Sequence, residues 1–316
     1  MNPDGTYERQ LSKLRKDLGE VFLAALADPE TVEIVLNADG TLWHERLGEP
    51  LQAIGTMSAP CADAAMRTIA AYHHATLTRD NPSIEFELPL DGSRFAGQIP
   101  PIVTAPVFAV RKRASRVFTL GQYVEAGIMT PEQKEFLCGA IRDHRNILVI
   151  GGTGGGKTTL LNGMIHELTD RFPNERLIII EDTAEIQCAA KNYVQYHTSP
   201  DRSMTELVRM SMRMRPDRIL VGEVRGPEAL DLLMSWNTGH EGGIASLHAN
   251  NAAAALNRLS TLVAMHPNAP RGLIESLIGE AVDVIIHIAR TDNGRIVRDV
   301  LEVEDFDKAT QTYNTK

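Results

Sequence analysis

The chain has 316 residues, of which 43% are hydrophobic and 23% charged, so one to three globular domains are expected. The formal net charge of −9 argues against a large general affinity for nucleic acid, and an aromatic content of 5% provides no extended platform for stacking bases. Three widely separated cysteines without a CxxC pair predict a reduced cytosolic protein that lacks a structural zinc site and a disulfide framework.

The sequence shows neither a membrane-spanning pattern nor an export signal. No apolar stretch approaches the roughly 18 residues of a transmembrane helix. Residues 1–20 are polar and charged, unlike a signal peptide. We therefore expect any membrane contact to be peripheral.

The first third of the chain alternates helical and strand-like patterns. Apolar residues recur every three or four positions from Leu11 to Leu26, which predicts an amphipathic helix over residues 7–27. Polar turns between the strands predict antiparallel hairpins, and hence a small α+β domain. The other expected elements are strands at 31–36 and 41–47, a helix at 60–76, and strands at 84–88, 94–99 and 105–111.

A dense basic run, Arg111-Lys112-Arg113-Ala114-Ser115-Arg116, follows the last of these strands. We place the domain boundary here. The prediction is an N-terminal domain at residues 1–113, a linker at 114–129 that contains a short helix, and a second domain at 130–316.

The second domain begins with a clear helix signal. Thr130 as N-cap, Pro131 at the first helical position and Gln133 three residues after the cap predict a helix that ends near residue 144. From residue 146 onward, short apolar runs alternate with helices, which is typical of a parallel, doubly wound sheet. The expected strands are 146–150, 177–180, 219–221 and 244–247, the helices 158–168, 203–214, 227–236, 252–265 and 271–279, and a final hairpin pairs 282–289 with 295–303.

The stretch Gly151-Gly152-Thr153-Gly154-Gly155-Gly156-Lys157-Thr158-Thr159 matches a P-loop, in which a glycine and four free positions precede Gly-Lys-Thr. A predicted strand before it and a helix after it supply the context that this motif requires. Glycines allow backbone N–H groups to surround a phosphate, and the helix N-terminus adds partial positive charge. Lys157 is expected to bind the β- and γ-phosphates of ATP, and Thr158 to offer its hydroxyl to Mg²⁺.

Acidic residues follow two of the predicted strands. Glu181 and Asp182 lie at a strand end where open α/β sheets bind ligands, so they are candidates for holding Mg²⁺ or polarising the attacking water. A solvated acidic turn is the alternative interpretation. Glu223 follows Gly222, where many P-loop enzymes carry an Asp. We therefore assign Glu223 alone to activating water, with a share in the Mg²⁺ shell.

Two histidines flank the strand predicted at 244–247. A metal site is conceivable, but no cysteine joins them and their spacing fits no zinc template. We expect His248, at the carboxyl end of the strand, to sense the γ-phosphate, and His240 to form hydrogen bonds behind or beside the phosphates. Ordinary loop histidines are the alternative.

Four stretches in this order resemble the motifs of the type II/type IV secretion ATPases, and in particular those of the TrbB-type conjugal-transfer ATPases. The P-loop resembles Walker A, residues 181–185 the Asp box, 215–223 Walker B, and 239–248 the His box. The glycine at 222 is that family's own pattern. The resemblance implies a hexameric ring in which each subunit joins a smaller N-terminal α+β domain to a RecA-like P-loop ATPase domain, with nucleotide between the two domains.

The resemblance also gives a role to arginines of the N-terminal domain, since the family contacts nucleotide phosphates with such residues. The matching positions are Arg94, Arg111 and Arg113. Guanidinium groups suit the charge that develops on a transferring phosphoryl group. The alternatives for the basic run are a solvated linker or a patch that faces anionic lipid.

The prediction is a Mg²⁺-dependent ATPase that powers type IV secretion or conjugal transfer, including pilus assembly, by nucleotide-driven domain movement. Its expected partners are further copies of itself, inner-membrane and cytoplasmic components of the secretion apparatus, and anionic lipid at the cytoplasmic face of the inner membrane, without specific nucleic-acid recognition. The alternatives are a pilus or type II secretion motor, a DNA-translocating RecA-like ATPase, and a nucleotide-gated scaffold with negligible turnover.

Overall fold

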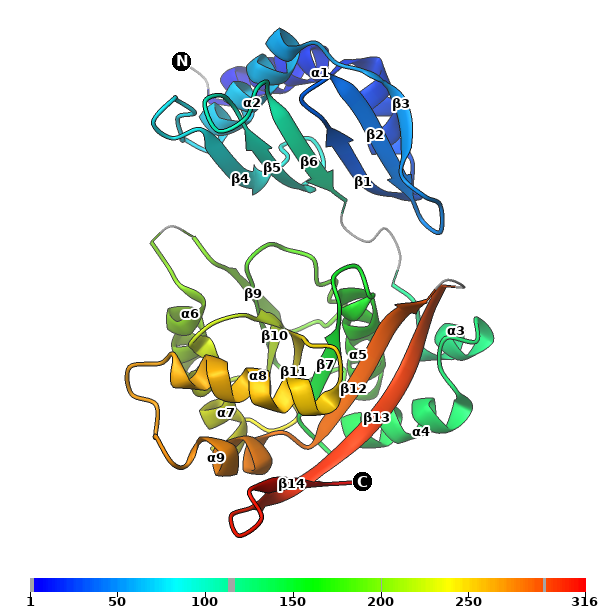
Figure 1. Cartoon of the computed structure of the whole chain (residues 1–316), viewed down its shortest axis with the longest axis vertical. Helices are drawn as coiled ribbons and strands as arrows, with labels where there is room; N and C mark the ends of the chain where they lie inside the picture. Colours follow the sequence, from blue (N-terminus) through cyan, green and yellow to red (C-terminus); the bar gives the residue numbers. More distant parts are fainter. Residues whose placement is uncertain (1–2, 113–116, 200, 292–293) are drawn as a thin grey trace. The chain divides into compact units, whose positions relative to one another are not determined.

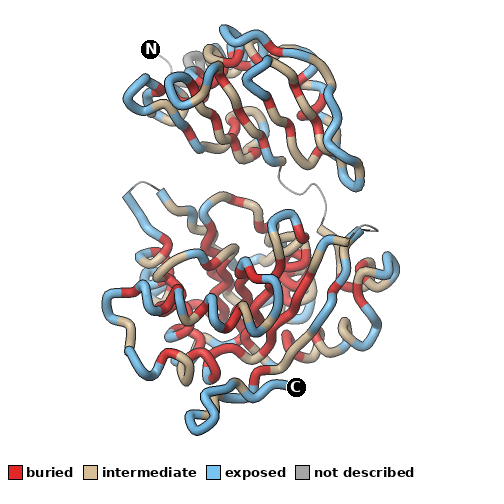
Figure 2. The backbone as a smooth tube through the Cα atoms, in the orientation of Figure 1, coloured by how far each residue is buried: buried red, intermediate tan, exposed pale blue. Residues whose placement is uncertain are grey.

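The computed structural model describes residues 3–112, 117–199, 201–291 and 294–316. The chain divides into two compact units, Met1–Ser115 and Arg116–Lys316. Each unit has its own sheet and its own apolar core (Figure 2). Within these described ranges, no helix combines the length and the apolar character needed to cross a bilayer.

The first unit is an antiparallel sheet with two helices on one face (Figure 1). The strand order is β3-β2-β1-β6-β5-β4, and alternate strand residues are buried because only one face is covered. Phe22 of the first helix meets Phe108 edge-to-face, with ring centroids 5.7 Å apart. The elements are α1 (Pro3–Ala27), β1 (Thr31–Leu36), β2 (Thr41–Arg46), β3 (Gln52–Thr56), α2 (Ala59–Tyr72), β4 (Ser83–Glu87), β5 (Arg94–Gln98) and β6 (Val107–Arg111).

The second unit is built on an eight-stranded sheet of order β14-β13-β12-β7-β11-β10-β8-β9. The six strands from β12 to β9 run parallel, which confirms the doubly wound α/β prediction, and β13 and β14 add an antiparallel edge. Its strands are β7 (Ile147–Gly151), β8 (Leu177–Glu181), β9 (Tyr193–His197), β10 (Arg218–Val224), β11 (Ile244–His248), β12 (Val284–Thr291), β13 (Gly294–Asp307) and β14 (Thr312–Thr315).

Helices cover both faces of this sheet. Alternate residues of β7 enter different cores: Ile147 and Val149 pack with the helices of one layer, and Leu148 and Ile150 with those of the other. The capping box predicted at Thr130 is present at the start of α4. One layer contains α3 (Leu120–Glu125), α4 (Pro131–Arg142) and α5 (Lys157–Arg171), and the other α6 (Met204–Ser211), α7 (Glu228–Asn237), α8 (Ala252–Ala264) and α9 (Ile274–Ala281).

The structure contains three strands that the sequence did not predict, namely β3, β9 and β14. All three lie at sheet edges. Edge strands pair through the backbone on one side and bury few side chains, so their sequences carry a weak hydrophobic pattern. The carboxyl-terminal hairpin was predicted correctly, and β13 continues four residues beyond the expected end.

The amino-terminal edge of the parallel strands has a structural role. Arg218, at the start of β10, is fully buried, and its Nε donates to Glu175 Oε2 at 2.6 Å. The guanidinium also lies over the ring of Phe172, 4.8 Å from its centroid. A buried charge needs such partners. The side chains at this edge are therefore used in contacts within the protein. A ligand site is therefore expected at the opposite, carboxyl-terminal edge.

Candidate functional site

The P-loop lies where β7 ends and α5 begins. Gly156 has a φ of +98°, a left-handed conformation that side chains rarely adopt. A Cβ on Gly151 would come within 2.2 Å of the carbonyl oxygen of Ile288 in β12. Both positions therefore require glycine. Gly152, Thr153, Gly154 and Gly155 form the turn between them, and Thr158 and Thr159 lie in the first turn of α5.

The Lys157 side chain folds back over this loop. Its Nζ donates to the carbonyl oxygens of Gly151 at 3.2 Å and Gly152 at 3.3 Å. The same nitrogen lies 3.9 Å from Oε1 of Glu223, which places the expected phosphate ligand beside the expected catalytic acid. The two residues that were predicted to share a site therefore lie close together.

Parallel register brings the other strand ends to the same edge. His248 pairs with Gly151 across β11 and β7, and Val221 of β10 pairs with Ile180 of β8. The register between β10 and β11 shifts after Val221, and this irregularity contains Gly222 and Glu223. The carboxyl-terminal edge of the sheet therefore carries the P-loop, His248, Glu223 and Glu181.

Glu181 is buried, and both of its carboxylate oxygens accept hydrogen bonds from the protein. Oε1 accepts from the backbone N–H of Glu185 at 3.0 Å and of Ile186 at 2.8 Å, and Oε2 accepts from Gln195 Nε2 at 2.7 Å. Burial raises the pKa of this carboxyl above its usual value, while the three hydrogen bonds act in the opposite direction. These contacts make Glu181 an anchor for the loop that follows β8.

Glu185 is the acid of this loop that faces the P-loop helix, and sequence reasoning gave it no role of its own. Its Oε2 accepts from Thr158 Oγ1 at 3.3 Å. Asn162, one turn further along α5, donates to the carbonyl of Glu185 at 3.4 Å and accepts from the N–H of Gln187 at 3.0 Å. The hydroxyl predicted to face Mg²⁺ therefore has Glu185, rather than Glu181, as its carboxylate neighbour.

Arg225 joins the two other predicted acids and was also missed. Its Nε and Nη2 both donate to Glu223 Oε2, and its Nη1 donates to Asp182 Oδ2 at 3.0 Å. Asp182 accepts a further hydrogen bond from Thr198 Oγ1 at 3.1 Å. Such a bridge depends on two strand ends that are 43 positions apart in sequence, so no local pattern predicts it.

The two histidines occupy different edges of the sheet. His248 is exposed beside Gly151, where a phosphate sensor is expected. His240 precedes β11, so it lies at the amino-terminal edge of the sheet. The five residues of β11 separate it from the P-loop, which lies at the carboxyl-terminal edge. Strands rise about 3.3 Å per residue, so the two edges are more than about 13 Å apart. This placement corrects the prediction that His240 forms hydrogen bonds behind or beside the phosphates.

Two of the three predicted arginines are neighbours in the first unit. Arg94 of β5 and Arg111 of β6 are directly opposite each other in the antiparallel register, so their side chains leave the same face of the sheet. Both lie on the face away from α1 and α2, and Arg94 Nη2 is 3.5 Å from Glu85 Oε2. Arg113 lies outside the described residues.

Arg295 is a further cation at the P-loop that sequence reasoning missed. Its Nη2 donates to the carbonyl of Gly154 at 3.4 Å, and a Cβ on Gly156 would come within 2.9 Å of Arg295 Cδ. The β13 strand thus packs directly against the P-loop turn. No local sequence pattern connects Arg295 with the P-loop, because β13 begins far along the chain from that motif.

The donor set fits a nucleoside triphosphate with Mg²⁺. Among the described residues, no group of three His, Cys, Asp or Glu side chains forms a ready metal site. Mg²⁺ in P-loop proteins takes a hydroxyl, phosphate oxygens and waters rather than an all-protein cage. Thr158 and the nearby Glu185 supply the protein side of such a shell, and the glycine turn at the helix N-terminus supplies phosphate donors.

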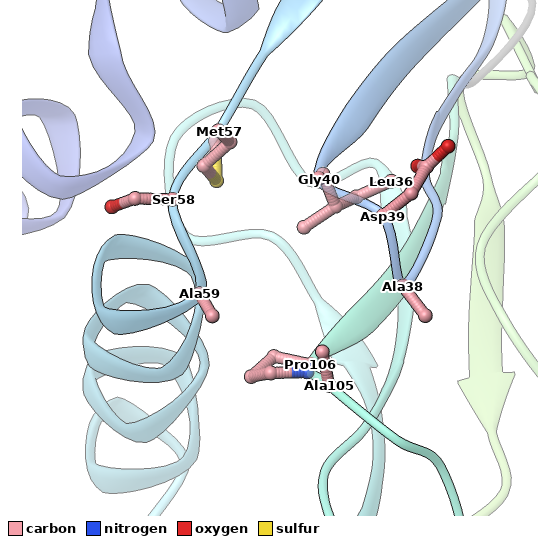
Figure 3. Close-up of a pocket in the computed structure, with 9 residues that line it drawn as sticks. All are labelled: Leu36, Ala38, Asp39, Gly40, Met57, Ser58, Ala59, Ala105 and Pro106. Atoms are coloured by element: carbon pink, nitrogen blue, oxygen red, sulfur yellow. The ribbon is translucent and has the colours of Figure 1, made fainter.

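A small cavity in the first unit is separate from these groups (Figure 3). Its volume is 170 Å³, and it lies between the β1–β2 turn, the start of α2 and the segment before β6. None of the predicted site residues lines it. The lining residues are Leu36, Ala38, Asp39, Gly40, Met57, Ser58, Ala59, Ala105 and Pro106.

Comparison with known proteins agrees with the motifs. Residues 61–313 match the family model described as "Type II/IV secretion system protein". The chain is 46% identical over 301 residues to a probable conjugal transfer protein TrbB of Sinorhizobium fredii, covering 95% of this chain and 92% of the relative.

Solved structures give the same result for the fold. The VirB11 ATPase of the Brucella suis type IV secretion system is 26% identical, with a TM-score of 0.50 and coverage of 94% of this chain and 96% of that one. The Legionella pneumophila ATPase DotB shares the fold, with a TM-score of 0.63 at 20% identity and coverage of 92% and 81%. These likenesses confirm the predicted RecA-like ATPase unit with a smaller N-terminal unit. The chain therefore belongs to the type II/IV secretion system protein family, as its motifs predicted, and is an ATPase of that family.

Proposed function

We propose that this ATPase works as a Mg²⁺-dependent homo-hexamer that drives conjugal transfer through a type IV secretion apparatus. The observation that carries the proposal is the convergence of Lys157 and Glu223 at the P-loop edge, 3.9 Å apart. The 46% identity to conjugal transfer proteins over nearly the whole chain supports the conjugal role.

The P-loop side of the site binds the phosphates. Lys157 exchanges its contacts with the carbonyls of Gly151 and Gly152 for the β- and γ-phosphate oxygens, which are stronger partners because they are charged. The N-terminus of α5 adds its partial positive charge. Mg²⁺, when bound, neutralises charge on the phosphates, and Thr158 with Glu185 is the pair that would hold it.

Glu223 orients the attacking water on the other side of the γ-phosphate. The water oxygen forms the new bond to phosphorus while the bond to the ADP oxygen breaks, and the water proton passes to Glu223 or to the released phosphate. His248, which is exposed at the end of β11 beside Gly151, would sense the γ-phosphate. Asp182 and Glu181 support the site: Asp182 holds Arg225, and Glu181 holds the 185–186 backbone.

Arg94, Arg111 and Arg113 complete the site from an N-terminal unit, in the same or a neighbouring subunit. Arg94 and Arg111 lie beside each other on one sheet face, between Glu87 and Glu33 in the same cross-strand row, and their guanidinium groups suit contact with an oxyanion. Movement of that unit upon hydrolysis would perform work on partner components at the cytoplasmic face of the inner membrane. Anionic lipid is a candidate ligand for the neighbouring basic run.

The test is ATP turnover and native mass of the purified full chain. We expect Mg²⁺-dependent hydrolysis that EDTA abolishes, and a particle of six times the chain mass of 34.7 kDa in the presence of nucleotide. Turnover should rise with anionic vesicles and be indifferent to DNA. A monomer with DNA-stimulated turnover would contradict the proposal and favour a translocase. In donor cells, replacing the gene with the E223Q variant should abolish conjugative transfer, and undiminished transfer would refute the conjugal role.

A further inference from the structure

Arg225 binds the carboxylate of Glu223 through one of its two oxygens. Two N–H groups of the guanidinium, Nε at 3.0 Å and Nη2 at 2.5 Å, donate to the same oxygen, Glu223 Oε2. The other oxygen, Oε1, is the one that lies 3.9 Å from Lys157 Nζ. The two carboxylate oxygens therefore have different environments before any nucleotide binds.

The position of Arg225 is itself fixed at both ends of the residue. The backbone N–H groups of Arg225 and Gly226 each donate to Oε1 of the buried Glu228 at 2.7 Å, at the start of α7. At the far end, Nη1 donates to Asp182 Oδ2, and Thr198 holds the other oxygen of Asp182. A half-exposed arginine would ordinarily adopt several rotamers, because holding a long side chain in one conformation costs entropy. Here anchors on the backbone and on the guanidinium restrict it.

We infer that Arg225 is a positioning residue that occupies Glu223 Oε2 and thereby directs Oε1 toward the water attacking the γ-phosphate. Glu223 sits in a strand irregularity, and such irregularities change the direction in which a side chain leaves the strand. Arg225 also forms ion pairs with both Glu223 and Asp182, so its positive charge reduces the repulsion between the two carboxylates. This inference rests on the proposed role of Glu223 in hydrolysis and adds a residue outside the four motifs to it.

The planar guanidinium is essential to this arrangement. Its fork gives two parallel donors to one oxygen and a third donor in a different direction, whereas a lysine ammonium is a point charge on a flexible stem. Arg225→Lys would keep the charge and lose the fixed direction. Arg225→Ala would leave Glu223 free to rotate and would place it near an unneutralised Asp182.

The experiment compares steady-state ATP hydrolysis by the full-length wild type, Arg225→Ala, Arg225→Lys and the control Arg142→Ala. Arg142 is of similar exposure, 60% against 51%, and likewise uses Nε and Nη2 to bind a carboxylate, that of Asp143. We expect Arg225→Ala to lower kcat by about tenfold to a hundredfold, with KM for ATP changed by less than about threefold. Arg225→Lys should recover only part of kcat, and Arg142→Ala should match the wild type.

Chemical rescue separates orientation from structural damage. Millimolar guanidinium should restore part of the kcat of Arg225→Ala, because the site is half-exposed, and should leave Glu223→Gln inactive. Full activity of Arg225→Ala or Arg225→Lys would overturn the inference, as would a loss that appears in KM alone or that guanidinium does not relieve. A wild-type protein without ATP turnover would instead refute the proposed function, so the two failures are distinct.

Discussion

Lys157 Nζ and Glu223 Oε1 are 3.9 Å apart, and their side chains are only 11% and 24% exposed. A cation and an anion are thus held close together in a partly desolvated site, from the helix after β7 and the irregular end of β10. Attraction across such a gap is stronger than at the surface. Incoming phosphates would compete with Glu223 for Lys157. Nucleotide binding should therefore break the contact between Lys157 and Glu223, while Glu223 keeps its hydrogen bonds to Arg225.

Replacing Lys157 with Ala should abolish nucleotide turnover and weaken ATP binding, because the phosphates lose their charged partner at the P-loop. We expect a loss of at least about a hundredfold in kcat/KM. Isothermal titration with a non-hydrolysable ATP analogue and a coupled hydrolysis assay measure the two effects. Normal turnover in this variant would refute the P-loop assignment. Lys191→Ala, which removes an exposed lysine outside the motif, is the control.

Replacing Glu223 with Gln should separate binding from hydrolysis. The amide keeps the size of the side chain but removes the charge that orients and deprotonates water, so Mg-ATP should bind while kcat falls by about 10²–10⁴-fold. Equilibrium binding and single-turnover assays show the separation. If the variant hydrolysed ATP at the wild-type rate, the water would have to be activated by another acid at this edge, such as Asp182 or Glu185. Equally slow hydrolysis by both proteins would indicate a nucleotide-gated scaffold.

Replacing Arg94, Arg111 or Arg113 with Ala should lower turnover without unfolding the protein. A guanidinium that stabilises the transferring phosphoryl group contributes about 10³–10⁵ in rate, so at least one of the three variants should lose about 10³-fold. Circular dichroism checks the fold, and Arg67→Ala, on α2 in the same unit, serves as the control. Unchanged kinetics in all three variants would return the basic run to a linker or membrane role and would leave Arg94 with its ion pair to Glu85.

The raised pKa of Glu181 predicts a pH-dependent contribution to stability. Because burial lifts the folded-state pKa above the unfolded value of 4.5, the favourable contribution of the protonated form is complete below pH 4.5 and is lost as the pH rises through the folded pKa. The free energy of unfolding of the wild type, relative to Glu181→Gln, should therefore decline as the pH rises above 4.5. Urea unfolding at a series of pH values measures it, and any fixed cost of the amide cancels in the slope.

A difference between wild type and Glu181→Gln that rises with pH would show that the hydrogen bonds to Glu181 outweigh its burial.

The predictable part of the site is the part encoded locally. The P-loop and Glu223 follow from short stretches in which strand, turn and functional residue are contiguous, and the structure places Lys157 and Glu223 together. Glu185, Arg225 and Arg295 were missed because their contacts depend on how separate strands align. His240 was misplaced for the same reason: sequence proximity to His248 hides the length of β11 between them.

The glycine at 222 has a partner in the buried carboxylate of the neighbouring strand. A Cβ at that position would lie 3.0 Å from Glu181 Cγ and 3.4 Å from its Oε1, so Glu181 already fills the space that a side chain at 222 would need. An aspartate there would also press two carboxylates together away from water, where like charges cannot both remain ionised. The glycine at 222 and the glutamate at 181 therefore depend on each other for space. A side chain at position 222 should therefore be tolerated best when a smaller residue replaces Glu181.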